Sequence, residues 1–274
     1  VYIEGDDNIG ASAVDFFKSL LADSSLLNRQ ATLELWNNVP TLVTPLQNDQ
    51  LIEEVTLEEV ERAVFELDGQ SAADSDGFAG CIYTHCWEII AEDVFRAARE
   101  FMCGVPLPKG IASTLVVLIP KKEVPTTFAD FRPISLCPFI TKVFPTILSN
   151  WIKIVLPTLI SLEQFNFVSG SEISDSILLA QEMVNSIDKK VRGHNVILKV
   201  DMIKAFDRVS WRFLSQLLGY FGFHPYFFSL VMNSLSSTWF SILVNRKPYG
   251  FFQTSHWNKG ITFLLFFLYG VRGA

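Results

Sequence analysis

Long uncharged apolar runs, paired cysteines and basic residues near the start are all scarce in this 274-residue sequence. The best candidate for a membrane span, ITFLLFFLYG (261–270), has ten residues, whereas a spanning helix needs about 20. No basic start followed by an apolar run marks a signal peptide. The sequence therefore predicts neither a membrane partner nor secretion.

The four cysteines form no CxxC pair. His85 lies between Cys81 and Cys86, but this spacing matches no common zinc pattern. Cys103, Cys137 and the other histidines are scattered along the chain. We expect reduced thiols in an intracellular protein, without a zinc site.

Basic residues are rare in the first part of the chain. Residues 1–80 hold 16 acidic and 3 basic side chains, a net charge of −13. The whole chain has 29 acidic and 22 basic residues, so 81–274 hold 13 and 19, a net charge of +6. An acidic head thus precedes a mildly basic body, and only the body could attract phosphates electrostatically.

With 49% hydrophobic residues, the chain can bury a large core. Apolar spacing predicts a mixture of helices and strands. Thr56 and Glu59 form the sequence signature of a helix-capping box. The expected helices are 11–22, 28–38, 56–67, 83–103, 141–155, 173–190, 207–222 and 225–236, and the expected strands are 114–120, 131–136, 196–201, 238–245 and 250–255, the last two as a hairpin.

One apolar run ends on a carboxylate, in LKVDMIKAFDRVSW (198–211). A buried strand would hold the Asp201 carboxylate rigidly, and oxygen ligands suit Mg²⁺. Two-metal phosphoryl transfer would need a further carboxylate from another strand. Alternatively, Asp201 caps the following turn. Phe206, five residues on, could be a core aromatic at a helix start.

Basic residues lie just after the expected strand at 114–120 and near the start of the expected strand at 131–136. Lys121 and Lys122 come directly after the first strand and could be a solvated strand end. Arg132 lies between apolar residues, where a guanidinium needs an anion or a carbonyl partner. Singly, these residues do not specify a function.

Their order along the chain is more specific. The series is DGF (76–78), LIPKK (118–122), DFRPISLC (130–137), LPTLISLEQFNFV (156–168), SDSILLAQE (174–182) and LKVDMIKAFDRVSWRFL (198–214). It resembles the reverse transcriptase of LINE-type (non-LTR) retrotransposons, especially the plant branch, over about residues 50–255. FRPISL and KVDMIKAFDRVSW carry most of the resemblance.

The resemblance implies an α+β fold with the fingers and partial palm of a right-hand polymerase. It implies an acidic helical spacer at 1–50, the fingers and partial palm at 51–255, and an aberrant apolar tail at 256–274. An RNA template, a DNA primer and dNTP would be the partners, with Mg²⁺ as cofactor and the nucleus as location. By resemblance, Asp201 binds metal as a catalytic residue, Phe206 is a steric gate against a 2′-hydroxyl, and Lys121 and Arg132 hold the triphosphate.

Several positions depart from the family pattern. The segment RGxRQGDPLSP is replaced by HWNKGITFLLFF after Ser255, and the aromatic-x-Asp-Asp motif is absent. No acidic residue follows Asp207. Trp151 stands where the family has the Arg of NRL, and Ser75, Asn166 and Ser171 are further departures. We expect a reverse transcriptase fragment, truncated before the second carboxylate motif and inactive alone.

Two alternatives remain open. The chain could be a non-catalytic nucleic-acid-binding or scaffold protein that reuses the fingers. It could also fold unstably, because the palm sheet would have an unpaired edge and the LLFFLYG tail would be exposed.

Overall fold

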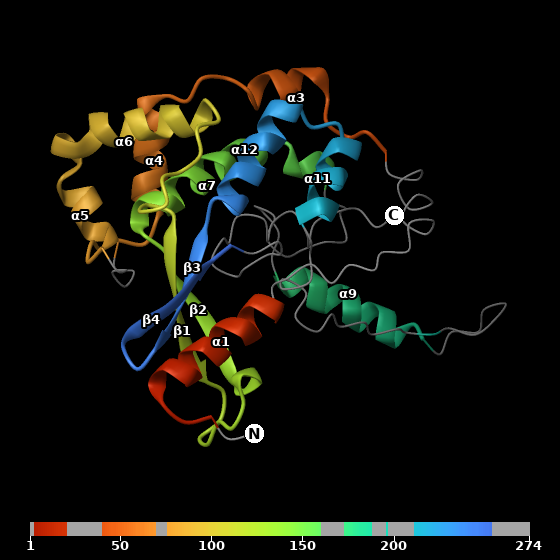
Figure 1. Cartoon of the computed structure of the whole chain (residues 1–274). Helices are drawn as coiled ribbons and strands as arrows, with labels where there is room; N and C mark the ends of the chain where they lie inside the picture. Colours follow the sequence, from red (N-terminus) through yellow and green to blue (C-terminus); the bar gives the residue numbers. More distant parts are fainter. Residues whose placement is uncertain are drawn as a thin grey trace.

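A computed structural model describes residues 3–20, 40–69, 76–159, 173–187, 196 and 211–253 (Figure 1). Helices and strands are mixed along these residues, which confirms the predicted α+β class. The helices are α1 (Asp6–Leu20), α3 (Pro45–Gln50), α4 (Leu57–Glu66), α5 (Gly80–His85), α6 (Trp87–Met102), η1 (Phe128–Asp130), α7 (Phe139–Ile152), α8 (Leu156–Leu159), α9 (Ile173–Asn185), α11 (Trp211–Tyr220) and α12 (Pro225–Ser236); the strands are β1 (Ser113–Pro120), β2 (Phe131–Leu136), β3 (Trp239–Val244) and β4 (Lys247–Phe252).

Four strands form one mixed sheet in the order β2-β1-β3-β4. The outer pairs are antiparallel hairpins, and the central pair β1–β3 is parallel. Both hairpin turns therefore lie at the same end of the sheet, beside the start of α1 (Figure 1). This arrangement places the basic residues after β1 at the same end as the turn between β3 and β4.

Helix α1 covers one face of this sheet and packs on β3 and β4. Ala13 and Phe17 of α1 are buried against Val116, Phe240 and Ile242 of the strands. Two glycines allow the close approach: a Cβ on Gly10 would meet the Tyr249 ring at 2.4 Å, and one on Gly250 would meet Val14 at 2.7 Å. The first helix of the acidic head is thus packed onto the body. The predicted helix at 28–38 and strand at 196–201 fall outside the described residues, apart from Val196.

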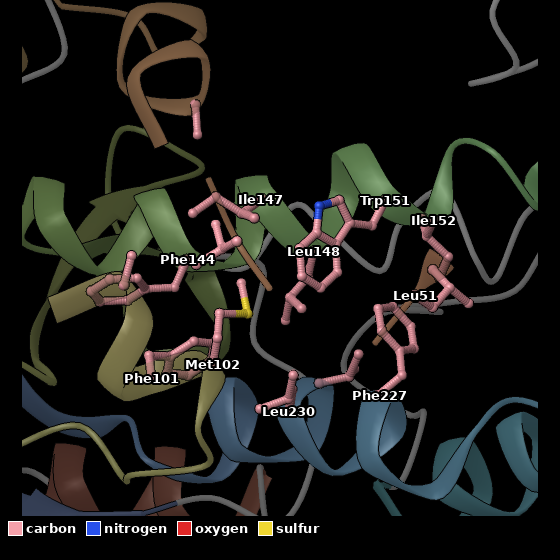
Figure 2. Packing of buried hydrophobic residues seen from close by; sticks show 14 of the residues in the cluster. Leu51, Phe101, Met102, Phe144, Ile147, Leu148, Trp151, Ile152, Phe227 and Leu230 are labelled. Carbon is pink, nitrogen blue, oxygen red and sulfur yellow. The ribbon is translucent and has the colours of Figure 1, made fainter. Parts of the chain in front are cut away.

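The larger core lies between α4, α6, α7, α11 and α12 (Figure 2). Rings stack within it, with Phe101 of α6 and Phe144 of α7 at a centroid distance of 5.0 Å. One turn further along α7, Ile147 and Leu148 are almost completely buried. Pro145 lies inside α7, but the helix continues to Ile152. Fully burying one such side chain stabilises a fold by roughly 1.5–3 kcal/mol.

Local sequence signals set most helix ends. The capping box of α4 forms as predicted, with the Thr56 hydroxyl accepting from the Glu59 amide and the Glu59 carboxylate accepting from the Thr56 amide at 2.8 Å. The helix expected at 83–103 is divided at Cys86 into α5 and α6. Gly104, at φ 84°, ends α6, and the Val105 amide then reaches the Glu100 carbonyl oxygen at 3.1 Å. This is the pattern of a Schellman motif.

Residues 42–48 are fixed to the turn between α11 and α12. The Asn48 amide group donates to the Gly222 carbonyl oxygen at 2.7 Å, and its oxygen accepts from the His224 amide at 2.7 Å. Leu42 and Val43 amides both donate to the Phe221 carbonyl oxygen. Within the described ranges, no helix is long and apolar enough to cross a membrane.

Candidate functional site

The Lys121 side chain lies just beyond β1, in the turn to β2. Its amide donates to the Asp130 carbonyl oxygen at 2.8 Å, so the hairpin ladder continues past the strand end. Its Nζ donates to the Ala129 carbonyl oxygen at 2.7 Å. Among the described residues no carboxylate pairs with this ammonium, so the turn orients its positive charge without neutralising it.

Asp130 fixes the shape of this turn. Its carboxylate accepts from the Thr126 and Thr127 amides, each at 2.9 Å, and pairs with Lys122 Nζ at 3.0 Å. The Thr126 amide, the Lys122 ammonium and the Thr127 amide together hold the pKa of Asp130 well below its usual range. The sequence reasoning missed this role, although the Thr127–Asp130 spacing of a capping box was a signal for it.

Arg132 is exposed on β2, opposite Ile119 of β1. The expected anion or carbonyl partner is not found among the described residues, and exposure explains why none is needed: water solvates the guanidinium. Lys121, in the turn after β1, and Arg132, near the start of β2, therefore lie near the same end of the sheet. Both cations are available to an anionic ligand.

Asp201 and Phe206 lie outside the described residues, so their placement beside Lys121 and Arg132 stays a prediction. Within the described ranges there is no group of three or more His, Cys, Asp or Glu side chains that could hold a metal ion. His85 Nδ1 instead lies 2.7 Å from the Cys81 carbonyl oxygen.

One departure from the family pattern retains a polar contact. The sequence resemblance predicts an arginine at the position of Trp151. Its indole Nε1 donates to the Glu59 carboxylate at 2.7 Å, while the ring is buried in the helical core (Figure 2). The indole N–H thus gives the Glu59 carboxylate a second hydrogen-bond partner besides Thr56.

The start of α1 contacts the β3–β4 turn through residues that the sequence reasoning did not connect. Asp7 accepts from Lys247 Nζ at 2.7 Å and from the Tyr249 hydroxyl at 3.1 Å. The hydrogen bond from Lys247 lowers the pKa of Asp7, and the same bond raises the pKa of Lys247. Part of the acidic head thereby balances the charge of the body at this end of the sheet.

Comparison with known proteins agrees with the motifs. The family described as reverse transcriptase (RNA-dependent DNA polymerase) matches residues 119–263, just over half of the chain. The Transposon TX1 uncharacterized 149 kDa protein of Xenopus laevis is 24% identical over 243 residues, covering 89% of this chain and 18% of that protein. The Retrovirus-related Pol polyprotein from type-1 retrotransposable element R2 of Nasonia vitripennis is 23% identical over 221 residues, covering 80% of this chain and 20% of that protein.

The chain thus spans about a fifth of the length of these two curated relatives. The family match begins at Ile119, so it includes Lys121 and Arg132 and continues through the β3–β4 hairpin. Because it covers more than half of the chain, this protein belongs to the reverse transcriptase family, and the predicted resemblance to the enzymes of non-LTR retrotransposons is confirmed.

Proposed function

We propose that this chain forms the fingers and part of the palm of an RNA-directed DNA polymerase from a non-LTR retrotransposon of the plant-like branch. The observation that carries the proposal is the β1–β2 hairpin, which presents Lys121 and Arg132 within the family match, neither of them ion-paired to another described residue. Phosphoryl transfer depends on positioning and charge stabilisation, and this hairpin supplies two positive charges on a rigid support.

In this proposal, Lys121 and Arg132 bind the triphosphate of the incoming dNTP. An RNA template and a DNA primer complete the substrates, and the protein acts in the nucleus. Phe206 excludes a 2′-hydroxyl and so favours deoxynucleotides. These assignments rest on the family motifs, and Phe206 lies outside the described residues.

The family implies a divalent metal ion, and we propose Mg²⁺ with Asp201 as a ligand. A pair of metal ions would stabilise the attacking and leaving oxygens of the transfer. After Asp207 the sequence holds no acidic residue, and the aromatic-x-Asp-Asp motif is absent. We therefore expect that these 274 residues alone do not polymerise DNA. RNA-templated dNTP incorporation that disappears in Asp201→Ala would contradict this expectation.

Nucleotide binding tests the proposal independently of turnover. A fluorescent dNTP is titrated into the chain and its Arg132→Gln and Lys121→Gln variants at low salt. We expect each substitution to weaken binding by about 10-fold or more, since a hydrogen bond to a charged group contributes about 1.5–3 kcal/mol. Arg96→Gln is the matched control, because Arg96 is also exposed but pairs with Asp93 at 3.9 Å. Equal losses in Arg132→Gln and Arg96→Gln would refute the assignment.

The net charge of +6 on residues 81–274 favours a second candidate, a non-catalytic nucleic-acid-binding or scaffold protein. This candidate predicts binding to an RNA–DNA duplex whose affinity falls steeply with salt. It also predicts that dNTP binding is absent or insensitive to Arg132. The two candidates are therefore separated by the dNTP titration.

A further inference from the structure

The turn between β1 and β2 carries Lys121, but most of the turn is exposed. Of residues 121–130, only Pro125, Phe128 and Asp130 are partly buried. The Asp130 carboxylate is bonded within the turn itself. Phe128 is the one apolar side chain of this turn that packs against the hydrophobic cluster between α1 and the sheet. The position of the turn relative to the sheet therefore depends largely on Phe128.

Two rings of α1 hold Phe128. The centroid of the Phe16 ring lies 5.7 Å from that of Phe128, and the centroid of the Phe17 ring lies 6.4 Å from it. Phe16 and Phe17 meet edge to face at 5.1 Å, and Phe17 is 2% exposed. Rings in tilted and edge-on arrangements at these distances attract one another beyond the effect of buried area. The turn is thus anchored to α1 by rings that are themselves fixed in a core.

Phe128 is adjacent in the chain to the atom that orients Lys121. It is the first residue of η1, and the carbonyl oxygen of the next residue, Ala129, accepts from Lys121 Nζ at 2.7 Å. A displacement of Phe128 would therefore move the Ala129 carbonyl group and, with it, the Lys121 ammonium. Arg132 depends less on this contact, because it is held in the β1–β2 ladder opposite Ile119.

The start of α1 is fixed separately, to the turn between β3 and β4. Asp7 accepts from Lys247 Nζ at 2.7 Å, and the Asn245 side-chain amide donates to the Asp6 carboxylate at 2.8 Å. Ten residues separate Asp7 from Phe17, or about 15 Å at about 1.5 Å per helical residue. Helix α1 therefore links the two hairpin turns, which lie at the same end of the sheet (Figure 1).

We propose that Phe17 and Phe128 are positioning residues for Lys121, so that α1, docked on the sheet, holds the β1–β2 turn in the form that binds a dNTP triphosphate. The inference rests on the proposed function, in which Lys121 binds the triphosphate. It adds to that site a helix that lies outside the family match of residues 119–263. The coupling is reciprocal by thermodynamic necessity, so a bound dNTP in turn stabilises the docked α1.

Titration of a fluorescent dNTP into the full chain tests this coupling. We expect Phe128→Ala and Phe17→Ala each to weaken binding by about fivefold or more, the lower end of the coupling between distinct sites. Phe128→Leu keeps an apolar side chain at the contact and should recover part of the loss. Val64→Ala is the matched control, because Val64 is 0% exposed but belongs to the larger helical core; its dNTP affinity should stay that of the wild type.

Double variants separate positioning from a general loss of stability. Phe128→Ala should add nothing in a chain that already carries Lys121→Gln, because both changes act on the same ammonium, and it should add its full effect to Arg132→Gln. A general loss of stability would weaken binding equally in both backgrounds. Hydrogen exchange gives the reciprocal readout: saturating dNTP should slow exchange of the α1 amides in the wild type, and less so in Phe128→Ala.

Each outcome decides the matter. Weaker binding in Phe128→Ala that is absent in the Lys121→Gln background, with Val64→Ala unchanged, supports the positioning role. If Lys121→Gln weakens dNTP binding but Phe128→Ala does not, the inference fails and the proposed function stands. The same holds if Val64→Ala weakens binding as much as Phe128→Ala. If the wild-type chain does not bind the dNTP, or Lys121→Gln binds it equally well, the inference and the proposed function fail together.

Discussion

The hydrogen bond between Trp151 and Glu59 gives a stability prediction that the structure makes quantitative. Trp151→Phe removes the indole N–H at 2.7 Å from the Glu59 carboxylate and leaves a smaller ring in the core. A hydrogen bond to a charged group contributes about 1.5–3 kcal/mol. Glu59 is only partly buried and keeps its capping bonds to Thr56, so water can replace part of the lost bond. We therefore expect about 1–1.5 kcal/mol from the bond itself.

Trp87→Phe isolates this contribution. Trp87 is 8% exposed and Trp151 is 7% exposed, and both belong to the same helical core. No described side chain accepts a hydrogen bond from the Trp87 indole, so its substitution reports mainly the loss of ring volume. Urea unfolding followed by far-ultraviolet circular dichroism should place Trp151→Phe about 1–1.5 kcal/mol below Trp87→Phe. Equal losses in the two variants would refute the reasoning. A coupling energy near zero between Trp151→Phe and Glu59→Ala would refute it as well.

Three further predictions concern the turns. Because the pKa of Asp130 is lowered, the stabilising contribution of its carboxylate is complete at neutral pH and is lost as the pH falls below about 4. The thermal midpoint of Asp130→Asn should therefore depend less on pH in acid than that of the wild type. Gly104→Ala should lower the free energy of unfolding by about 1 kcal/mol, because a residue with a Cβ is strained at φ 84° even where the Cβ meets nothing. Gly110→Ala is the control: its Cβ would also meet nothing, its φ is not positive, and its thermal midpoint should be nearly unchanged. Asn48→Ala removes two hydrogen bonds, and at about 1 kcal/mol per bond it should lower the free energy of unfolding by about 2 kcal/mol. A change below about 0.5 kcal/mol would contradict this prediction.

Local signals in the sequence were sufficient for much of the secondary structure. The Thr56–Glu59 capping box predicted the start of α4, and short apolar runs predicted β1 and the β3–β4 hairpin. Pro225 marked the first turn of α12. The short helix α3 was missed, although Thr44 and Gln47 form a capping box there, because six residues carry too little apolar periodicity.

Contacts between distant residues could not be read from the sequence. Nothing local indicates that β1 pairs with β3 in parallel, or that Asp7 bonds to Lys247. The site was predicted as four residues, and the structure describes two of them, Lys121 and Arg132. The stacked aromatic pair of the β3–β4 hairpin was also missed, because Trp239 and Phe251 are twelve residues apart and meet only across the hairpin.

The parallel pairing of β1 with β3 also determines when the sheet can be completed during synthesis. The β1–β2 hairpin can form as soon as Leu136 has left the ribosome, but about 100 further residues must follow before Trp239 appears. At about 5–20 residues per second this takes roughly 5–20 s. Throughout that interval α1 has no β3–β4 hairpin to pack on, so its apolar stripe and the inner edge of β1 stay available to chaperones or to other nascent chains. Helix α1, which is synthesised before the other helices described here, is thus among the last of them to be buried.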